Sequence, residues 1–375
     1  MKKIFFILEN LGEGGGGSER FVVNLCNELS KKNPNVYLLS LTNKGNFYRK
    51  YINKKVNLFI FPFFKSIHSF YYLYKFLKKN KPKIVFSTSF HVTVYAIIIK
   101  VLTSNNFFLI SRISNNIHEY FKHNKSIKLN ILYFLYFNLL KYIDYFICPS
   151  KGLAHELKIH INRKYHNKIL HIRNLVDENF ILNQSKLNSS STNFIKKKFF
   201  LNIARLVSNK DHITLIKAFK YFLSIRGEKD NNYCLVIIGV GNLIYDLKNL
   251  IKKENLQNKI IILQNVNNPY VFIKKSEIFV LSSIFEGYPN VLLEAQVLNK
   301  KIISTDCKHG PREILGNGKY GYLVKTKNYK SLGLTMDNAL NNKNRSISLI
   351  KLKKRNSLEL IAQEYFNLFE RLNDK

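Results

Sequence analysis

Acidic residues are scarce in this sequence, which limits the surfaces that the protein can present. The 375 residues include 24 Asp and Glu against 60 Lys and Arg, so the formal net charge is +36. No acidic residue occurs between Glu28 and Glu119, whereas 15 Lys and Arg do. A surface of one sign attracts anionic lipid headgroups or nucleic acid. Because basic residues are frequent in both halves of the chain, part of the excess reflects overall composition.

Cysteine is also rare, and long uncharged apolar runs are missing. The cysteines are far apart and form no C-x-x-C pair: Cys26, Cys148, Cys234 and Cys307. Neither a zinc site nor a disulfide framework is therefore indicated, and the pattern favours thiols in a reducing compartment. The best apolar run, residues 131–140, is too short to span a membrane. The apolar start contains Glu9 and lacks a small-residue cleavage site, so we interpret it as a core strand. We expect no transmembrane helix.

The first half of the chain alternates short apolar runs with helical stretches. Continuous apolar runs are typical of parallel strands that are buried on both faces. Their alternation with helices predicts an α/β fold with a parallel sheet. The expected strands cover residues 3–11, 36–41, 58–61, 84–87, 107–110 and 145–148.

A second α/β series follows a polar Ser/Asn-rich segment. Its expected strands cover residues 199–204, 234–239, 260–263, 278–282 and 301–305, and its expected helices residues 212–223 and 245–252. We therefore predict two Rossmann-like, doubly wound domains that face a cleft, where a ligand should bind. The predicted parts are a first domain (1–183), a linker (184–195), a second domain (196–355) and an amphipathic C-terminal helix (356–375) that could cross back to the first domain.

The most informative segment is FEGYPNVLLE, residues 285–294. Pro289 suits the first turn of a helix because it has no N–H to leave unpaired there. We therefore expect Glu286 in the loop before that helix and Glu294 inside it. The N–H groups of residues 290–292 should point out of the helix start, where orphan donors and the helix dipole bind anions. A phosphate between two carboxylates suits a sugar nucleotide, with one carboxylate for sugar hydroxyls and the other for ribose hydroxyls.

A basic segment follows the first strand of the second series. Arg205 offers a rigid fork of donors to phosphate oxygens, and Lys210 offers a compact charge. Together they could neutralise a departing diphosphate. The alternative interpretation is a solvated loop in a lysine-rich chain.

A glycine-rich loop follows the first expected strand. Gly12, Gly14 and Gly17 match G-x-G-x-x-G between a strand and a helix. A dinucleotide site also requires an acidic residue about 20 residues further on, and none follows Glu28 until Glu119. Three interpretations stay open: an NAD(P) site, a loop whose backbone meets a diphosphate or an acceptor, and a tight turn.

These motifs together resemble a retaining glycosyltransferase of the GT-B fold, family 4 type. The family's E-x7-E motif stands here as Glu286 and Glu294, and its basic pair as Arg205 and Lys210. Residues 14–17 match its glycine loop, and NLVDENF at 174–180 resembles the end of its first domain. The resemblance implies transfer of a hexose or N-acetylhexosamine, with retained anomeric configuration, from a nucleotide sugar that is UDP-linked. The acceptor would be a glycan or polyprenyl-linked glycan in bacterial surface polysaccharide synthesis.

The resemblance also implies roles for individual residues. Arg205 and Lys210 would stabilise the leaving diphosphate, Glu286 would hold sugar hydroxyls, and Glu294 would bind the ribose. His91, after the strand at 84–87, either contacts the donor sugar or has no role. Further nucleotide-sugar contacts would come from Gly15, Gly16, Val266, Gly287, Asn290 and Val291. No metal and no cofactor is implied, and the sequence has no D-x-D pair.

Our expectations about the acceptor side and the cellular location are based on composition. Residues 61–79 and 117–145 mix aromatic and basic side chains, which suits either a membrane interface or ordinary helix packing. Arg112 and Asn116 resemble a family segment on the acceptor side. We expect a cytoplasmic protein that contacts the anionic inner face of the membrane. The alternatives are a basic nucleic-acid-binding protein without catalysis, for which no RNA or DNA module is seen, and a GT-B-like epimerase or phosphorylase.

Overall fold

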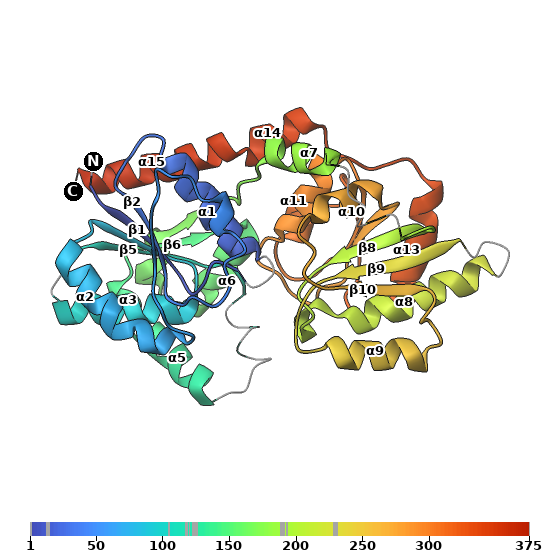
Figure 1. Cartoon of the computed structure of the whole chain (residues 1–375), viewed down its shortest axis with the longest axis horizontal. Helices are drawn as coiled ribbons and strands as arrows, with labels where there is room; N and C mark the ends of the chain where they lie inside the picture. Colours follow the sequence, from blue (N-terminus) through green and yellow to red (C-terminus); the bar gives the residue numbers. More distant parts are fainter. Residues whose placement is uncertain are drawn as a thin grey trace. The chain divides into compact units, whose positions relative to one another are not determined.

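The chain forms two compact units, which are described separately below (Figure 1). Unit 1 comprises Met1–Leu175 and Asn356–Lys375, and unit 2 comprises Val176–Arg355. The computed structural model describes residues 2–12, 16–103, 106–116, 119, 121, 127–187, 192, 194–227 and 232–374. Within these ranges, no helix combines the length and apolar character that crossing a bilayer requires.

Unit 1 is built on a parallel sheet with the strand order β3-β2-β1-β4-β5-β6-β7. The order reverses between β1 and β4, which is the arrangement of a doubly wound fold. The strands are β1 (Ile4–Leu8), β2 (Val36–Ser40), β3 (Asn57–Ile60), β4 (Ile84–Ser87), β5 (Phe108–Arg112), β6 (Tyr145–Cys148) and β7 (Ile169–His171).

Helices cover both faces of this sheet, so its central strands are mostly apolar and β1 is apolar throughout. In β1, Ile4, Phe6 and Leu8 pack in one hydrophobic cluster, and Phe5 and Ile7 pack in the other. This alternation follows from the two-residue period of a strand. The helices of unit 1 are α1 (Gly17–Leu29), α2 (Phe70–Asn80), α3 (Phe90–Thr103), α5 (Ile127–Asn138), α6 (Lys151–His160) and α15 (Leu358–Asn373), with short 3-10 helices η1 (Arg49–Tyr51), η2 (Ser66–Ser69), η3 (Leu140–Tyr142) and η4 (Arg163–Lys168).

The last helix, α15, belongs to the core of unit 1, where it lies beside α1 (Figure 1). Its buried side chains reach the first face of the sheet. The rings of Tyr365 and Phe369 lie 5.8 and 6.4 Å from the ring of Phe86 in β4, and the ring of Phe369 lies 6.1 Å from that of Phe6 in β1. The expected return of the C-terminal helix to the first domain is confirmed.

Unit 2 repeats the plan with the strand order β10-β9-β8-β11-β12-β13, again all parallel. Its strands are β8 (Lys198–Ile203), β9 (Tyr233–Ile238), β10 (Ile260–Leu263), β11 (Ile278–Leu281), β12 (Lys301–Thr305) and β13 (Tyr322–Val324). Its helices are α7 (Glu178–Lys186), η6 (Ser208–Lys210), α8 (His212–Arg226), α9 (Ile244–Lys253), α10 (Pro269–Lys275), α11 (Asn290–Val297), α12 (Pro311–Ile314) and α13 (Tyr329–Asn341), and α14 (Leu349–Asn356) ends at the return to unit 1.

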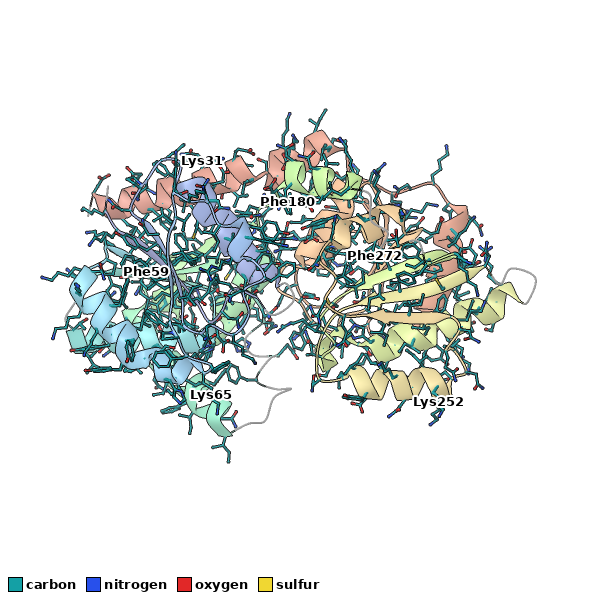
Figure 2. The ribbon with its side chains drawn as sticks, viewed as in Figure 1. Lys31, Phe59, Lys65, Phe180, Lys252 and Phe272 are labelled. Carbon is teal, nitrogen blue, oxygen red and sulfur yellow. The ribbon has the colours of Figure 1, made fainter. Side chains whose placement is uncertain are left out.

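The division between the units differs from the predicted boundary at residue 183. Unit 2 already begins at Val176 because α7 packs against α10 and α11. Phe180, labelled in Figure 2, stacks edge-on against Tyr270 at 5.9 Å. The predicted linker therefore begins within α7, whose last turn is Ser- and Gln-containing and gave no helical signal. Residues 188–191 and 193 of that linker lie outside the described residues.

The contribution of α15 to unit 1 can be tested with two leucines of the same helix. Leu368 is buried in the cluster against the sheet, whereas Leu360 is 41% exposed. We expect Leu368→Ala to lower the free energy of unfolding by about 2–5 kcal/mol, because the substitution leaves a cavity. Leu360→Ala should cost less than about 1 kcal/mol. Urea denaturation measures both, and equal losses would show that α15 does not complete this core.

Candidate active site

The loop after β8 is fixed by an unusually close approach of two glycines. A Cβ on Gly239 would lie 1.9 Å from the carbonyl oxygen of Ala204, and a Cβ on Gly241 would lie 2.3 Å from that of Leu206. The N–H of Leu206 donates to the carbonyl of Val240 at 2.8 Å. Only glycine permits this contact between the loops that follow β8 and β9. These glycines were not among the predicted site residues, although G-x-G at the end of an expected strand was a visible signal.

Lys210 lies at the end of this loop, immediately before α8. Asp211 adopts a left-handed conformation, with φ of 47°, and caps the helix. Its carboxylate accepts from the N–H of Thr214 at 3.2 Å and from the Thr214 hydroxyl at 2.7 Å. The Ser282 hydroxyl donates to the carbonyl of Lys210 at 2.8 Å. These bonds fix the backbone of Lys210 between the start of α8 and the end of β11.

The structure brings Lys210 and Glu286 into direct contact. Lys210 Nζ lies 2.5 Å from Glu286 Oε1, and the same oxygen accepts from the Ser283 hydroxyl at 2.6 Å. The Glu286 residue is only 4% exposed. A buried carboxylate is costly unless it is paired and hydrogen-bonded, and here it is both. Two residues that the sequence assigned to one site, 76 positions apart, therefore form one charged pair.

Cys307 lies buried close to this pair. Burial is the main reason that the pKa of its thiol is raised, and the negative charge of Glu286 raises it further, whereas Lys210 lowers it. A thiol of raised pKa stays protonated and is a poor nucleophile. Cys307 therefore lines the site as a neutral side chain, a role that the sequence analysis did not foresee.

His212 is buried directly behind Lys210, in the first turn of α8. Burial, with a smaller contribution from the charge of Lys210, lowers the pKa of His212 to about 4. In the described structure, neither ring nitrogen has a hydrogen-bond partner. The imidazole is therefore neutral near pH 7 and adds no second positive charge beside Lys210.

The predicted helix of the decapeptide is present as α11. Glu286 lies in the loop before it, and Glu294 is buried within it, as expected. Pro289 is the N-cap in an extended conformation rather than a first-turn residue. The expectation that the N–H of Leu292 points out of the helix start was wrong, because that group donates to the carbonyl of Pro289 at 3.1 Å.

Gly310 holds the loop before α11 in place. It has φ of 82°, and a Cβ there would lie 2.9 Å from the carbonyl oxygen of Gly287 and 2.7 Å from Pro289 Cδ. The N–H of Glu286 donates to the carbonyl of Lys308 at 3.2 Å. The turn that follows β12 therefore supports the backbone from Glu286 to Pro289, on which Gly287 is buried.

Two other predicted residues of unit 2 do not take part in the Lys210–Glu286 contact. Arg205 is exposed two residues after β8 and is not part of the Lys210–Glu286 contact. Val266 is half-buried in the loop between β10 and α10, where it packs against the core. Asn290 and Val291 are half-buried in the first turn of α11.

The predicted residues of unit 1 lie near the carboxyl ends of its strands. Gly16 is the extended N-cap of α1, whereas Gly15 lies outside the described residues. His91 is in the first turn of α3, with Nε2 3.6 Å from Glu9 Oε2. Arg112 is a core residue, because its guanidinium is buried 4.0 Å from the ring of Phe21 and burial lowers its pKa. Among the described residues, no three His, Cys, Asp or Glu side chains are grouped to hold a metal ion.

Comparison with known families matches both units. The model described as "Glycosyltransferase Family 4" matches residues 15–180, and that described as "Glycosyl transferases group 1" matches residues 184–357. The chain belongs to the group 1 glycosyltransferases. An uncharacterized glycosyltransferase of Methanocaldococcus jannaschii is 35% identical to this glycosyltransferase over 295 residues, which cover 72% of this chain and 70% of that protein.

Two further similarities bear on fold and chemistry. Over 138 residues, 37% of this glycosyltransferase and 36% of the relative, it is 38% identical to a Campylobacter jejuni enzyme, N-acetylgalactosamine-N,N'-diacetylbacillosaminyl-diphospho-undecaprenol 4-alpha-N-acetylgalactosaminyltransferase. The crystal structure of Anabaena HepE in complex with UDP-glucose superposes with a TM-score of 0.80 at 14% identity, covering 99% of this chain and 100% of that one. The expected GT-B fold of two Rossmann-like domains is thereby confirmed.

The neutral state of His212 predicts a pH dependence of stability. The imidazole has a pKa near 6.5 when unfolded and about 4 when folded, so between these values the unfolded chain binds a proton that the folded chain does not. Stability should therefore fall as the pH drops from 6.5 to 4, by about 3 kcal/mol from this residue alone. We expect urea unfolding of His212→Leu to lose that part of the dependence. Parallel pH profiles of variant and wild type would contradict the assignment.

Proposed function

We propose that this glycosyltransferase moves a hexose or N-acetylhexosamine from a UDP-sugar to a glycan carried on a polyprenyl diphosphate, with retention of anomeric configuration. The observation that carries the proposal is the buried contact between Lys210 and Glu286 at the ends of β8 and β11. The Campylobacter relative, whose name specifies a diphospho-undecaprenol acceptor and an N-acetylgalactosaminyl group, supports the classes of acceptor and sugar. The fold shared with HepE, which was crystallised with UDP-glucose, supports the UDP-linked donor.

In the proposed reaction, the bond between the anomeric carbon and the diphosphate oxygen breaks. A bond from the same carbon to the acceptor hydroxyl oxygen forms on the same face of the sugar, and the hydroxyl proton passes to the departing diphosphate. Negative charge develops on the diphosphate as its bond to carbon breaks, before the proton reaches it. Lys210, whose amine is already oriented by Glu286, and the exposed fork of Arg205 are suited to stabilise it. The proposed reaction needs no metal ion, because these cations supply the compensating charge.

The carboxylate of Glu286 has two different oxygens in this scheme. Oε1 accepts from Lys210 and Ser283, and within the described structure no hydrogen bond occupies Oε2. An oxygen whose partner is rigidly held is a preorganised acceptor. We assign Oε2 to the hydroxyl groups of the donor sugar, and the N–H groups of Gly287, Asn290 and Val291 to sugar or phosphate oxygens. Glu294, one helical turn further, is assigned to the ribose.

Substitution of the pair tests this assignment. We expect Lys210→Ala and Glu286→Gln each to lower kcat by about 10²–10³-fold, the loss typical of removing one group that stabilises developing charge. Lys220→Ala is a matched control, because Lys220 also pairs with a glutamate, Glu254, but on the exposed side of α8. It should retain full turnover in a radiolabelled-sugar transfer assay. Near-normal turnover in either site variant, with circular dichroism unchanged, would show that the pair is not the catalytic site.

Donor binding is tested separately by thermal shift with UDP-, GDP- and ADP-sugars. A ligand that binds only the native state at 100 times its dissociation constant stabilises that state by about 2.7 kcal/mol. We expect a rise in melting temperature with UDP-sugars, the same rise in the presence of a chelator, and a much smaller rise for Glu286→Gln. If the chelator abolished the shift, the metal-independent scheme would be wrong. No shift with any of the three nucleotides would count against nucleotide-sugar binding.

A further inference from the structure

The outward side of η2 and α2 in unit 1 is both aromatic and basic. Its exposed apolar side chains include Phe64, which is 76% exposed, and Tyr71, which is 56% exposed. Exposed lysines lie directly among them. We call this surface the basic aromatic face; its residues are Phe64, Lys65, Ile67, Tyr71, Tyr72, Lys75, Lys78 and Lys79. Lys65, labelled in Figure 2, belongs to the segment just before η2.

The inner side of α2 shows that core packing does not account for this face. Leu73 and Leu77 are buried against the sheet, and Phe70 packs beside them. The exposed positions 71, 72, 75, 78 and 79 recur at helical spacing on the opposite side. Both interpretations of residues 61–79 therefore apply, one to each side of the same helix. Of the outer rings, Tyr72 lies 4.9 Å from the ring of Phe63, yet Tyr71 and Tyr72 remain 56% and 53% exposed.

The lysines on this face lie close to aromatic rings. Lys75 Nζ is 4.4 Å from the centre of the Tyr71 ring, and Lys78 Nζ is 3.4 Å from the Tyr74 hydroxyl. Aromatic rings beside lysine ammonium groups are the combination that settles at the headgroup level of a bilayer, with the ring in the apolar boundary and the cation in the phosphate layer.

Neighbouring helices of the same layer extend the apolar surface. α5 exposes Ile127, Ile131 and Phe134, which are spaced four and three residues apart and so form one stripe; Ile127 is 79% exposed and Phe134 is 66% exposed. α3, which packs against both α2 and α5, exposes Leu102 at its end. Figure 1 shows these three helices grouped on the same side of the unit 1 sheet. Exposed apolar surface of this extent marks an interaction site.

We propose that the basic aromatic face binds the surface of an anionic lipid bilayer. Charge selects this partner. No acidic residue occurs between residues 29 and 118, so η2, α2 and α3 carry only positive charge. A second copy of the chain would place lysines against lysines and be repelled. The lipid phosphates of a bilayer attract each lysine, and the apolar boundary beneath them accommodates the exposed rings. The inference goes beyond the proposed transfer reaction and depends on none of its residues.

Sedimentation with vesicles tests the proposal. We expect the full chain to sediment with phosphatidylglycerol/phosphatidylcholine vesicles and to stay in solution with pure phosphatidylcholine. Lys75→Gln/Lys78→Gln/Lys79→Gln should weaken binding on the order of 100-fold, because each lysine near an anionic surface contributes about fivefold. Phe64→Ser/Ile67→Ser, which alters no charge, should weaken it at least about tenfold through the lost apolar insertion.

The matched control lies on α9 of unit 2, an amphipathic helix of similar length. Its exposed Tyr245, Lys248, Lys252 and Lys253 resemble the basic aromatic face in composition, but Asp246 lies among them. Lys248→Gln/Lys252→Gln/Lys253→Gln should change vesicle binding less than about threefold. Equal losses of vesicle binding in the two lysine variants would show that binding depends only on net charge, which would overturn the proposal.

The aromatic variant decides between a bilayer and a soluble polyanion. Normal vesicle binding by Phe64→Ser/Ile67→Ser would mean that the lysines bind any polyanion, which would also overturn the proposal. UDP-sugar thermal shifts of all variants should match wild type and so report that the donor site is intact. Vesicle binding without any UDP-sugar shift would leave this inference standing and reject the proposed function.

Discussion

The buried carboxylate of Glu286 is the group on which the arrangement of unit 2 depends. A charge at this depth is tolerated only with donors in place, and these come from Lys210 and Ser283. To deliver them, the loops after β8, β11 and β12 must meet. They do so through hydrogen bonds to backbone carbonyls: Ile284 N–H donates to the Asn209 carbonyl at 2.8 Å, and the Thr305 hydroxyl donates to the Ser283 carbonyl at 2.6 Å. The carboxylate therefore ties three adjacent strand ends into one rigid site.

Unit 1 uses the same sheet topology for a different purpose. Among its described residues, the ends of the strands carry few charged side chains. The deeply buried Arg112 guanidinium packs against the Phe21 ring and donates to the side-chain oxygen of Asn174 at 2.5 Å. Its distinctive chemistry lies instead on the outer side of α2. One fold thus separates a polar, internally paired site in unit 2 from an exposed basic surface in unit 1, and each property follows from where the acidic residues occur in the sequence.

Much of the fold could be predicted because apolar runs in doubly wound domains coincide with strands. The strands at 145–148, 260–263 and 301–305 have the predicted bounds. β7 and β13 were missed because a strand of only three residues is too short to give a periodic signal. In the site, the position of Pro289 between Glu286 and Glu294 correctly placed one acid in a loop and the other in a helix. The Lys210–Glu286 contact and the roles of His212 and Cys307 arise only from tertiary packing, which no local pattern encodes.

The return of α15 to unit 1 has a consequence for how the protein is made. Unit 2 is a continuous stretch of chain, Val176–Arg355, whereas the core of unit 1 is completed by Tyr365, Leu368 and Phe369. During synthesis, domains fold as their residues emerge from the ribosome. Unit 2 can therefore fold while unit 1, although translated first, still exposes the apolar groove that α15 will fill. Unit 1 is therefore translated first but completed last. Its unfilled apolar groove is the surface that a chaperone would bind on the nascent chain.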